Sequence, residues 1–352
     1  MIENFKPQTS TECYLGAISG NYDGELPKPK TRKQLLLGEI AQKSSKPIDL
    51  VGKQYFDENG DKKGEIFGNY ENNKATGVFS SAFGTSCTAS GHASLAGGQG
   101  STASGTASMA FGSGNTASGN ESMAFGGGCK SEGNYSLSFG GGCTSKAMYS
   151  LSFGGGCMAE SESAFALGRG CTASGEGAVS LGTNSSSTGA HSFAMGNYYT
   201  KYGSNYVTTA SGDHSFAFGE AVQATGKCSQ AFGGWAYGYN GMCKITRASA
   251  DYSTAFGQGT TAASPNQFVI GKYNLADESG KFAFIIGNGD GTHDFNIFSI
   301  GWDGKIYLSG SETGISLTDL LSSVATLENE VATLKSKVAA FESSGLQGGE
   351  TQ

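Results

Sequence analysis

Charged residues, long apolar runs and prolines are all scarce in this chain of 352 residues. Only 15% of the residues are charged and the formal net charge is -7, so the basic stripe that nucleic-acid phosphates require is missing. No run of about eighteen apolar residues is present, so the sequence predicts no membrane-spanning helix. We therefore expect neither a nucleic-acid partner nor insertion into a membrane.

Proline is confined to the beginning of the chain and to one later position. Four of the five prolines lie in the first 47 residues, and the fifth is Pro265. Because proline cannot donate a backbone hydrogen bond, its absence from 48–264 favours continuous strand pairing there. Residues 1–65 differ in composition from the rest. They include a short predicted helix, capped by Thr31, whose apolar residues are candidates for attachment to a partner: Leu35, Leu36, Leu37 and Ile40.

The most regular feature of the sequence is a glycine at every fourteenth position. The series runs without a slip through Gly84, Gly98, Gly112, Gly126, Gly140, Gly154, Gly168, Gly182 and Gly196. A second glycine lies seven residues before most of them. A fixed period indicates stacked layers that cannot bury their apolar faces alone. We expect two short strands and two turns in each layer, with the repeat glycine at a turn.

Two longer steps interrupt the later repeats. The intervals from Gly196 to Gly219 and from Gly233 to Gly257 exceed fourteen by nine and ten residues. Insertions in a stacked solenoid project as loops. Their aromatic residues are candidate receptor contacts, because exposed Tyr and Trp offer flat apolar faces with polar tips: Tyr198, Tyr199, Tyr202, Trp235, Tyr237 and Tyr239. The alternative is that these rings pack against a neighbouring chain.

From Leu317 onwards the apolar residues follow a heptad spacing. The predicted seam consists of Leu317, Leu320, Val324, Leu327, Val331, Leu334, Val338 and Phe341. With Leu317 at position a, Glu330 falls at g and Lys335 at the following e, and Lys337 with Glu342 repeats this relation. Such pairs join in-register parallel helices, so we expect parallel self-association. Val at a with Leu at d favours two strands by itself.

Two groups of candidate chemical residues have simpler interpretations. Five cysteines share one repeat position, which elsewhere holds Ser or Asn: Cys87, Cys129, Cys143, Cys157 and Cys171. A position shared by these residue types favours packing of a small side chain over a disulfide framework or metal chemistry. His191 and His214 precede a Ser-Phe-Ala motif in consecutive repeats, and we interpret them as solvated turn residues without a metal.

The unit SxAFG followed by TASG resembles the head repeat of trimeric autotransporter adhesins of the YadA type, over about 70–271. The resemblance implies an all-β solenoid: a left-handed parallel β-roll of fourteen residues per coil, with three chains side by side. It outweighs the dimer preference of the heptads, so we expect a homotrimer. The segments 64–84, 266–289 and 298–310 are also similar to fibre proteins of tailed bacteriophages and prophages, in which an N-terminal segment sits on the virion.

These features divide the chain into five expected regions. They are an N-terminal virion-attachment region (1–65), YadA-like β-roll repeats (66–264), a small β cap with a WDG turn (265–311), a short parallel coiled coil (312–343) and a flexible tail (344–352).

The function expected from the resemblance is a non-enzymatic structural fibre of a phage virion, on its head or tail. Its partners would be itself, as a homotrimer, capsid or tail proteins through the N-terminus, and a host-surface glycan or protein. The alternative is a bacterial surface adhesin. Since the N-terminus lacks a signal-peptide core, we expect synthesis in the host cytoplasm and location in the virion. We predict no cofactor and no catalytic residue, because a depolymerase would need paired carboxylates and the acidic residues of the repeats are scattered.

Overall fold

The computed structural model describes residues 53–56, 62–69, 72–197, 199–201, 204–237, 243–308 and 315–346. Contacts divide the chain into two compact units, Met1–Ser180 and Leu181–Gln352. Each unit is built from coils of a parallel β-solenoid, and the second also contains the helix α2 (Leu317–Leu346). The β-solenoid and the C-terminal helix expected from the sequence are confirmed.

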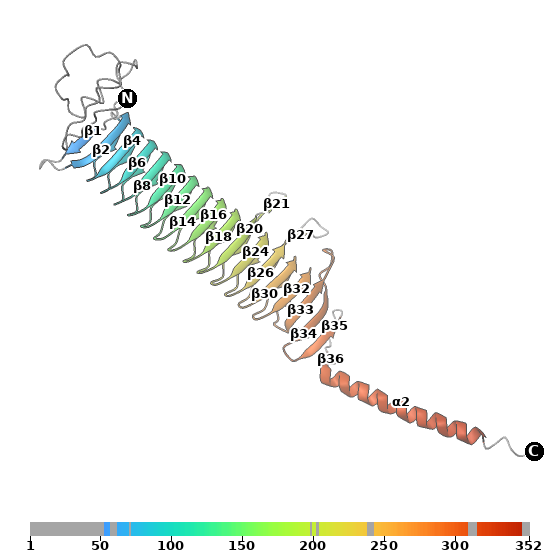
Figure 1. Cartoon of the computed structure of the whole chain (residues 1–352). Coiled ribbons are helices and arrows are strands. Elements are labelled where there is room, and N and C mark those ends of the chain that lie inside the picture. Colours follow the sequence, from blue (N-terminus) through green and yellow to red (C-terminus); the bar gives the residue numbers. More distant parts are fainter. Residues whose placement is uncertain are drawn as a thin grey trace, which may run out of the picture. The chain divides into compact units, whose positions relative to one another are not determined.

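Each coil of the first unit has one long and one short strand (Figure 1). The long strands are β2 (Lys62–Asn69), β4 (Ser80–Thr85), β6 (Leu95–Gln99), β8 (Met109–Ser113), β10 (Met123–Gly127), β12 (Leu137–Gly141), β14 (Leu151–Gly155) and β16 (Phe165–Arg169). The short strands are β3 (Lys74–Ala75), β5 (Thr88–Ala89), β7 (Thr102–Ala103), β9 (Thr116–Ala117), β11 (Lys130–Ser131), β13 (Thr144–Ser145), β15 (Met158–Ala159) and β17 (Thr172–Ala173). The strand β18 (Val179–Thr183) crosses the boundary between the units.

Parallel pairing in register makes the fourteen-residue period the length of one coil. Gly126 of β10 lies opposite Gly112 of β8 on one side and Gly140 of β12 on the other. The first coil is longer, because Gly68 of β2 pairs with Gly84 of β4. An antiparallel strand, β1 (Lys53–Phe56), pairs with β2 on its other side.

Small side chains fill the interior of the coils, and large ones face outward. In β10 the side chain of Ala124 is fully buried, whereas Met123 and Phe125 on either side of it are only partly buried. The same alternation recurs along the ladder, so the core of the first unit is a narrow column of Ala, Ser and Cys. Successive residues of a strand point to opposite faces, which places the aromatic residues on the outside.

The repeat glycine lies inside a long strand and not at a turn, which corrects the sequence prediction. Gly126 has φ +118°, and a Cβ atom there would lie 1.9 Å from the carbonyl oxygen of Gly140 in the next coil. Two requirements therefore select glycine: a backbone conformation that L-residues rarely adopt, and contact between the backbones of adjacent coils.

The second unit continues the same pattern with two inserted hairpins. Its long strands are β20 (Phe193–Asn197), β24 (Phe216–Glu220), β26 (Gln230–Gly234), β30 (Thr254–Gln258) and β32 (Phe268–Lys272). Its short strands are β19 (Ser186–Ser187), β23 (Thr209–Ala210), β25 (Gln223–Ala224), β29 (Arg247–Ala248) and β31 (Thr261–Ala262). The antiparallel hairpins are β21 (Tyr199–Lys201) with β22 (Ser204–Tyr206), and β27 (Ala236–Tyr237) with β28 (Cys243–Lys244).

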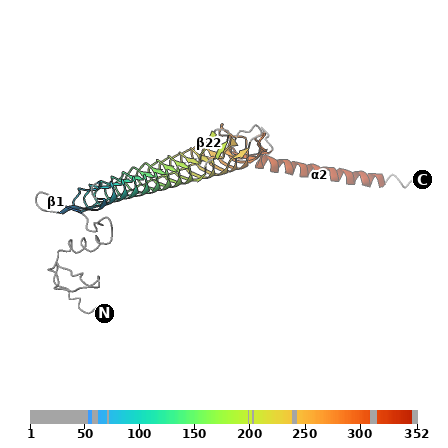
Figure 2. The same ribbon diagram turned by 90° about the horizontal axis from the view of Figure 1, so that it is seen from above.

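The hairpins do not disturb the ladder. Gly196 still pairs with Gly219, and Gly233 still pairs with Gly257, although each step contains an insertion. Figure 1 and Figure 2 show the hairpin elements outside the stack of long strands. The insertions are thus accommodated as projections from intact coils, as the sequence predicted.

The parallel ladder extends one strand past the glycine repeats, to β33 (Phe282–Asn288), where Gly271 pairs with Gly287. Three antiparallel strands follow: β34 (Asn296–Gly301), β35 (Lys305–Leu308) and β36 (Ile315–Ser316). The predicted WDG turn at 302–304 joins β34 to β35.

The short-strand ladder ends on a side chain instead of another strand. The Asn274 carboxamide accepts a hydrogen bond from the Thr261 N–H at 2.7 Å and donates one to the Thr261 carbonyl at 2.9 Å. Asn296 repeats this arrangement on the backbone of Leu275. The Asn274 amide satisfies backbone groups that the last short strand would otherwise leave unpaired, and the Asn296 amide does the same for Leu275.

Candidate self-association and recognition surfaces

The outward face of the long strands in the first unit carries a column of phenylalanine rings. Ring centroids are 5.5 Å apart between Phe111 and Phe125, 6.2 Å between Phe125 and Phe139, and 6.3 Å between Phe139 and Phe153. Phe139 remains 54% exposed. The apolar column has no covering element among the described residues of the first unit. Such a contiguous apolar surface is characteristic of an interaction site.

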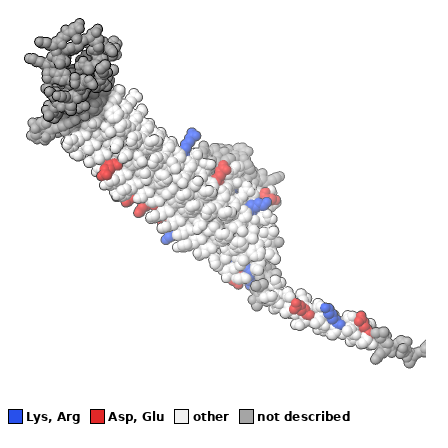
Figure 3. Space-filling view, viewed as in Figure 1, with Lys and Arg blue, Asp and Glu red and all other residues white. Residues whose placement is uncertain are grey.

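The second unit has an apolar outer face of the same kind. Phe193 and Phe216 stack with centroids 4.7 Å apart, and Phe232 and Phe256 are 5.8 Å apart. Phe218 and Phe256 are largely exposed. Figure 3 shows that few charged side chains interrupt the described surface on the face in view. Each unit therefore presents apolar rings to solvent in the single chain.

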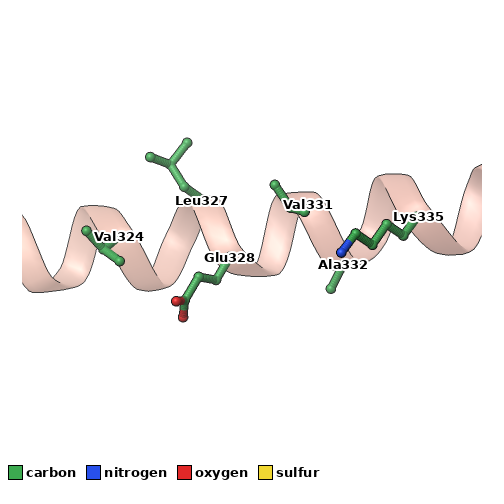
Figure 4. A pocket seen from close by; sticks show the side chains of 6 residues that line it. All are labelled: Val324, Leu327, Glu328, Val331, Ala332 and Lys335. Carbon is green, nitrogen blue, oxygen red and sulfur yellow. The ribbon is translucent and has the colours of Figure 1, made fainter.

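In the helix α2, every residue of the predicted heptad seam whose side chain is described is exposed. The relative exposure of these residues lies between 44% (Val324) and 80% (Phe341). A shallow depression along the helix is lined by Val324, Leu327, Glu328, Val331, Ala332 and Lys335 (Figure 4). All six side chains come from the same helix, so one helix supplies both the apolar ridge and the charges beside it. For the seam residue Leu317, the structure describes only the backbone.

The predicted contact residues of the insertions are only partly within the described structure. Tyr199 lies in β21 and Tyr237 in β27, where the backbone alone is described, and Trp235 is partly buried. The others lie outside the described residues: Tyr198, Tyr202 and Tyr239. The predicted attachment residues also lie outside them: Leu35, Leu36, Leu37 and Ile40.

The second hairpin is joined to the C-terminal cap by an ion pair. Lys244 of β28 donates from Nζ to Oδ1 of Asp294, which precedes β34. Both side chains are about one-third exposed. Sequence reasoning missed this contact because the two residues are 50 positions apart. The ion pair is a direct contact between the hairpin and the cap within the second unit.

The position eleven residues before a repeat glycine is buried, and we call it the donor slot. In an uninterrupted coil it lies three residues after the preceding repeat glycine. In seven of the described coils, its side chain donates to the carbonyl of that repeat glycine. Cys129 contacts Gly140 at 3.2 Å, and Thr246 contacts Gly257 at 2.9 Å. The other slots with this contact are Asn73, Ser101, Asn115, Cys143 and Thr208. The sequence indicated that a small residue is needed here, and the structure shows that these seven side chains also act as donors. Val222 is buried in the same slot without a donor group.

The cysteines of the donor slot are free thiols in the interior of the coils. All six cysteines with described side chains are free, and five of them are buried. Burial raises the pKa of the Cys143 thiol, and a hydrogen bond with the Cys171 thiol, followed by burial, raises the pKa of Cys157. Because the thiolate is the reactive form, a raised pKa lowers the reactivity of Cys143 and Cys157. This agrees with the packing interpretation of the sequence.

His191 and His214 stack on one edge of the second unit. Their ring centroids are 5.2 Å apart and their planes are 13° from parallel. Both residues are exposed and adopt positive φ in the turns that precede β20 and β24. Both therefore lie on exposed turns, as the sequence predicted.

The geometry defines a parallel β-solenoid with a core of small residues and apolar outer faces. The family model for the YadA head domain repeat (2 copies) matches residues 89–115, 103–129, 117–142, 173–198 and 246–266. These segments are similar to YadA-type head repeats, and the match supports an adhesin-type structural fibre. No curated protein matches the sequence. Among the described residues, no helix is both long and apolar enough to cross a membrane.

Proposed function

We propose that this chain is the subunit of a non-enzymatic, homotrimeric fibre of the adhesin type. The observation that carries the proposal is the exposure of two apolar surfaces in one chain: the phenylalanine columns of the solenoid and the heptad seam of α2. Burying one Leu, Val or Phe side chain contributes about 1.5–3 kcal/mol, so covering these columns with copies of the same chain yields a large driving force.

The charges of α2 favour a copy of the same helix as the partner. Glu330 and Lys335 flank the seam at positions that meet across two parallel, in-register helices, and Lys337 with Glu342 repeats the pair with reversed sign. An antiparallel arrangement would not bring these positions together. The YadA head repeats favour three copies, whereas the Val and Leu pattern alone favours two.

Sedimentation equilibrium of the full chain tests the copy number. We expect a mass of three chains, and we expect Leu327→Glu to weaken the assembly because it places a charge in the seam. Asn329→Glu adds the same charge on the outer face of the helix and serves as the matched control. A monomeric wild-type chain, or equal weakening by both variants, would contradict the proposal.

Zero-length cross-linking tests the orientation. Labelled and unlabelled chains are mixed during refolding, and mass spectrometry then identifies the bonds between chains of different label. We expect mixed-label cross-links between Glu330 and Lys335. Links that instead join the two ends of the helix would show antiparallel packing.

For the location of the fibre, we propose a phage virion, with residues 1–65 attached to capsid or tail proteins. The supporting observation is the resemblance of 64–84, 266–289 and 298–310 to phage and prophage fibre proteins. Expression of residues 66–352 tests it. We expect a folded trimer that is not incorporated into particles. The shortened chain loses β1 and the first half of β2, but it keeps every coil from β4 onwards. Normal incorporation would show that attachment lies elsewhere in the chain.

A bacterial surface adhesin is the second candidate, because the YadA head repeats support it equally. In either setting, the aromatic insertions near Trp235 are the proposed contacts for a surface glycan or protein. Immunolabelling of purified particles and of intact producing cells separates the two. Label confined to particles supports the virion, and label on cells that carry no particles supports the adhesin.

A further inference from the structure

The backbone holds His191 and His214 in equivalent positions of adjacent coils. The His214 N–H donates to the Ala190 carbonyl at 2.7 Å, and the Asp213 carboxylate accepts a hydrogen bond from the Ala190 N–H at 3.0 Å. Both histidines have positive φ, 53° and 56°, so their side chains leave the turn in the same direction. The stacked imidazoles therefore follow from the coil ladder and not from a chance contact of two mobile side chains.

We propose that His191 and His214 form a two-imidazole site for a divalent ion of the late first row: Ni²⁺, Cu²⁺ or Zn²⁺. Imidazole nitrogen is a ligand that suits all three ions. Bonds from such an ion to imidazole nitrogen are about 2.0–2.1 Å long, so two ligating nitrogens lie at most about 4 Å apart. The ring centroids are 5.2 Å apart, and closing this difference requires only that the ring tips tilt towards each other. Both side chains are exposed and have room to rotate.

The chain supplies two ligands to this site and leaves the other positions open. Nowhere in the described part of the chain do three His, Cys, Asp or Glu side chains converge well enough to hold a metal ion. The neighbouring carboxylate of Asp213 already accepts a backbone hydrogen bond. Water, or a donor group on another molecule, would complete the coordination. An exchangeable site of this kind suits a metal-dependent contact with a second molecule better than a structural role.

Nickel titration of the full chain by calorimetry tests the proposal. The second imidazole binds intramolecularly, so we expect the wild-type chain to bind Ni²⁺ about 100-fold more tightly than a variant with one imidazole removed. His191→Gln and His214→Gln should each lose this advantage. His92→Gln is the matched control, because His92 is also exposed on a turn but its ring contacts Phe79 and not another imidazole. Circular dichroism verifies that all variants are folded.

Electron paramagnetic resonance of the Cu²⁺ complex provides a second readout. The wild-type spectrum should show coupling to two imidazole nitrogens, and either single variant should show coupling to one. Equal Ni²⁺ affinity of wild type and His214→Gln would overturn the proposal. A loss of affinity in His92→Gln as large as that in His214→Gln would overturn it as well, because the pair would then have no special role.

Discussion

Two adjacent glycines in β10 should respond to alanine in opposite directions. At Gly126, alanine would be forced into a backbone of φ +118° with its Cβ 1.9 Å from the Gly140 oxygen. Strained backbone conformations contribute about 1–3 kcal/mol of destabilisation. Moving the Gly140 carbonyl away would also weaken about two ladder hydrogen bonds at about 0.5–1.5 kcal/mol each. We expect Gly126→Ala to lower the free energy of unfolding by roughly 2–6 kcal/mol.

Gly127 is the matched control in the same strand. A Cβ atom there meets nothing within 4 Å, and its φ is not positive. Alanine reduces the freedom of the unfolded chain, so we expect Gly127→Ala to stabilise the protein by about 0.4–1 kcal/mol. Urea unfolding followed by circular dichroism measures both variants. If Gly126→Ala unfolds at the same urea concentration as Gly127→Ala, contact between adjacent backbones does not select the repeat glycine.

Two further changes test the buried polar contacts. Cys143→Ser should retain the stability of the wild-type chain, because Ser also donates to the Gly154 carbonyl. Cys143→Val should lower the free energy of unfolding by about 1–3 kcal/mol, because it leaves that carbonyl without the donor. Thermal unfolding compares the two variants, and equal stability would contradict the donor-slot interpretation. Asn274→Ala removes both hydrogen bonds to the backbone of Thr261, so hydrogen exchange of the backbone amides in β31 should accelerate. Unchanged exchange would show that the Asn274 side chain does not close the ladder.

The coil length, the helix and the hairpin turn at 302–304 could be predicted from the sequence because each has a local signature. The glycine spacing predicts the length of a coil, the heptad spacing predicts the helix α2, and the WDG sequence predicts the turn. The role of Gly126 could not be assigned correctly, because its constraint comes from an atom fourteen residues away. The donor slot was missed for the same reason: the partner of Cys129 is the carbonyl of Gly140 in the next coil. Predicting such contacts requires knowing which residues of adjacent coils lie opposite each other and where their side chains point. The glycine spacing suggests the first but not the second.

The arrangement of large and small residues reverses the usual pattern of a globular core, and this has a measurable consequence. Ala124 and its equivalents fill the interior, while Phe125 and Phe139 face outward, so one chain buries little of its own large apolar surface. The rings are buried only if the outer faces associate. Folding is then linked to association, and stability rises with protein concentration. We expect the thermal midpoint of the full chain to increase over a hundredfold range of concentration, and a constant midpoint would mean that the phenylalanine columns remain exposed in the folded state.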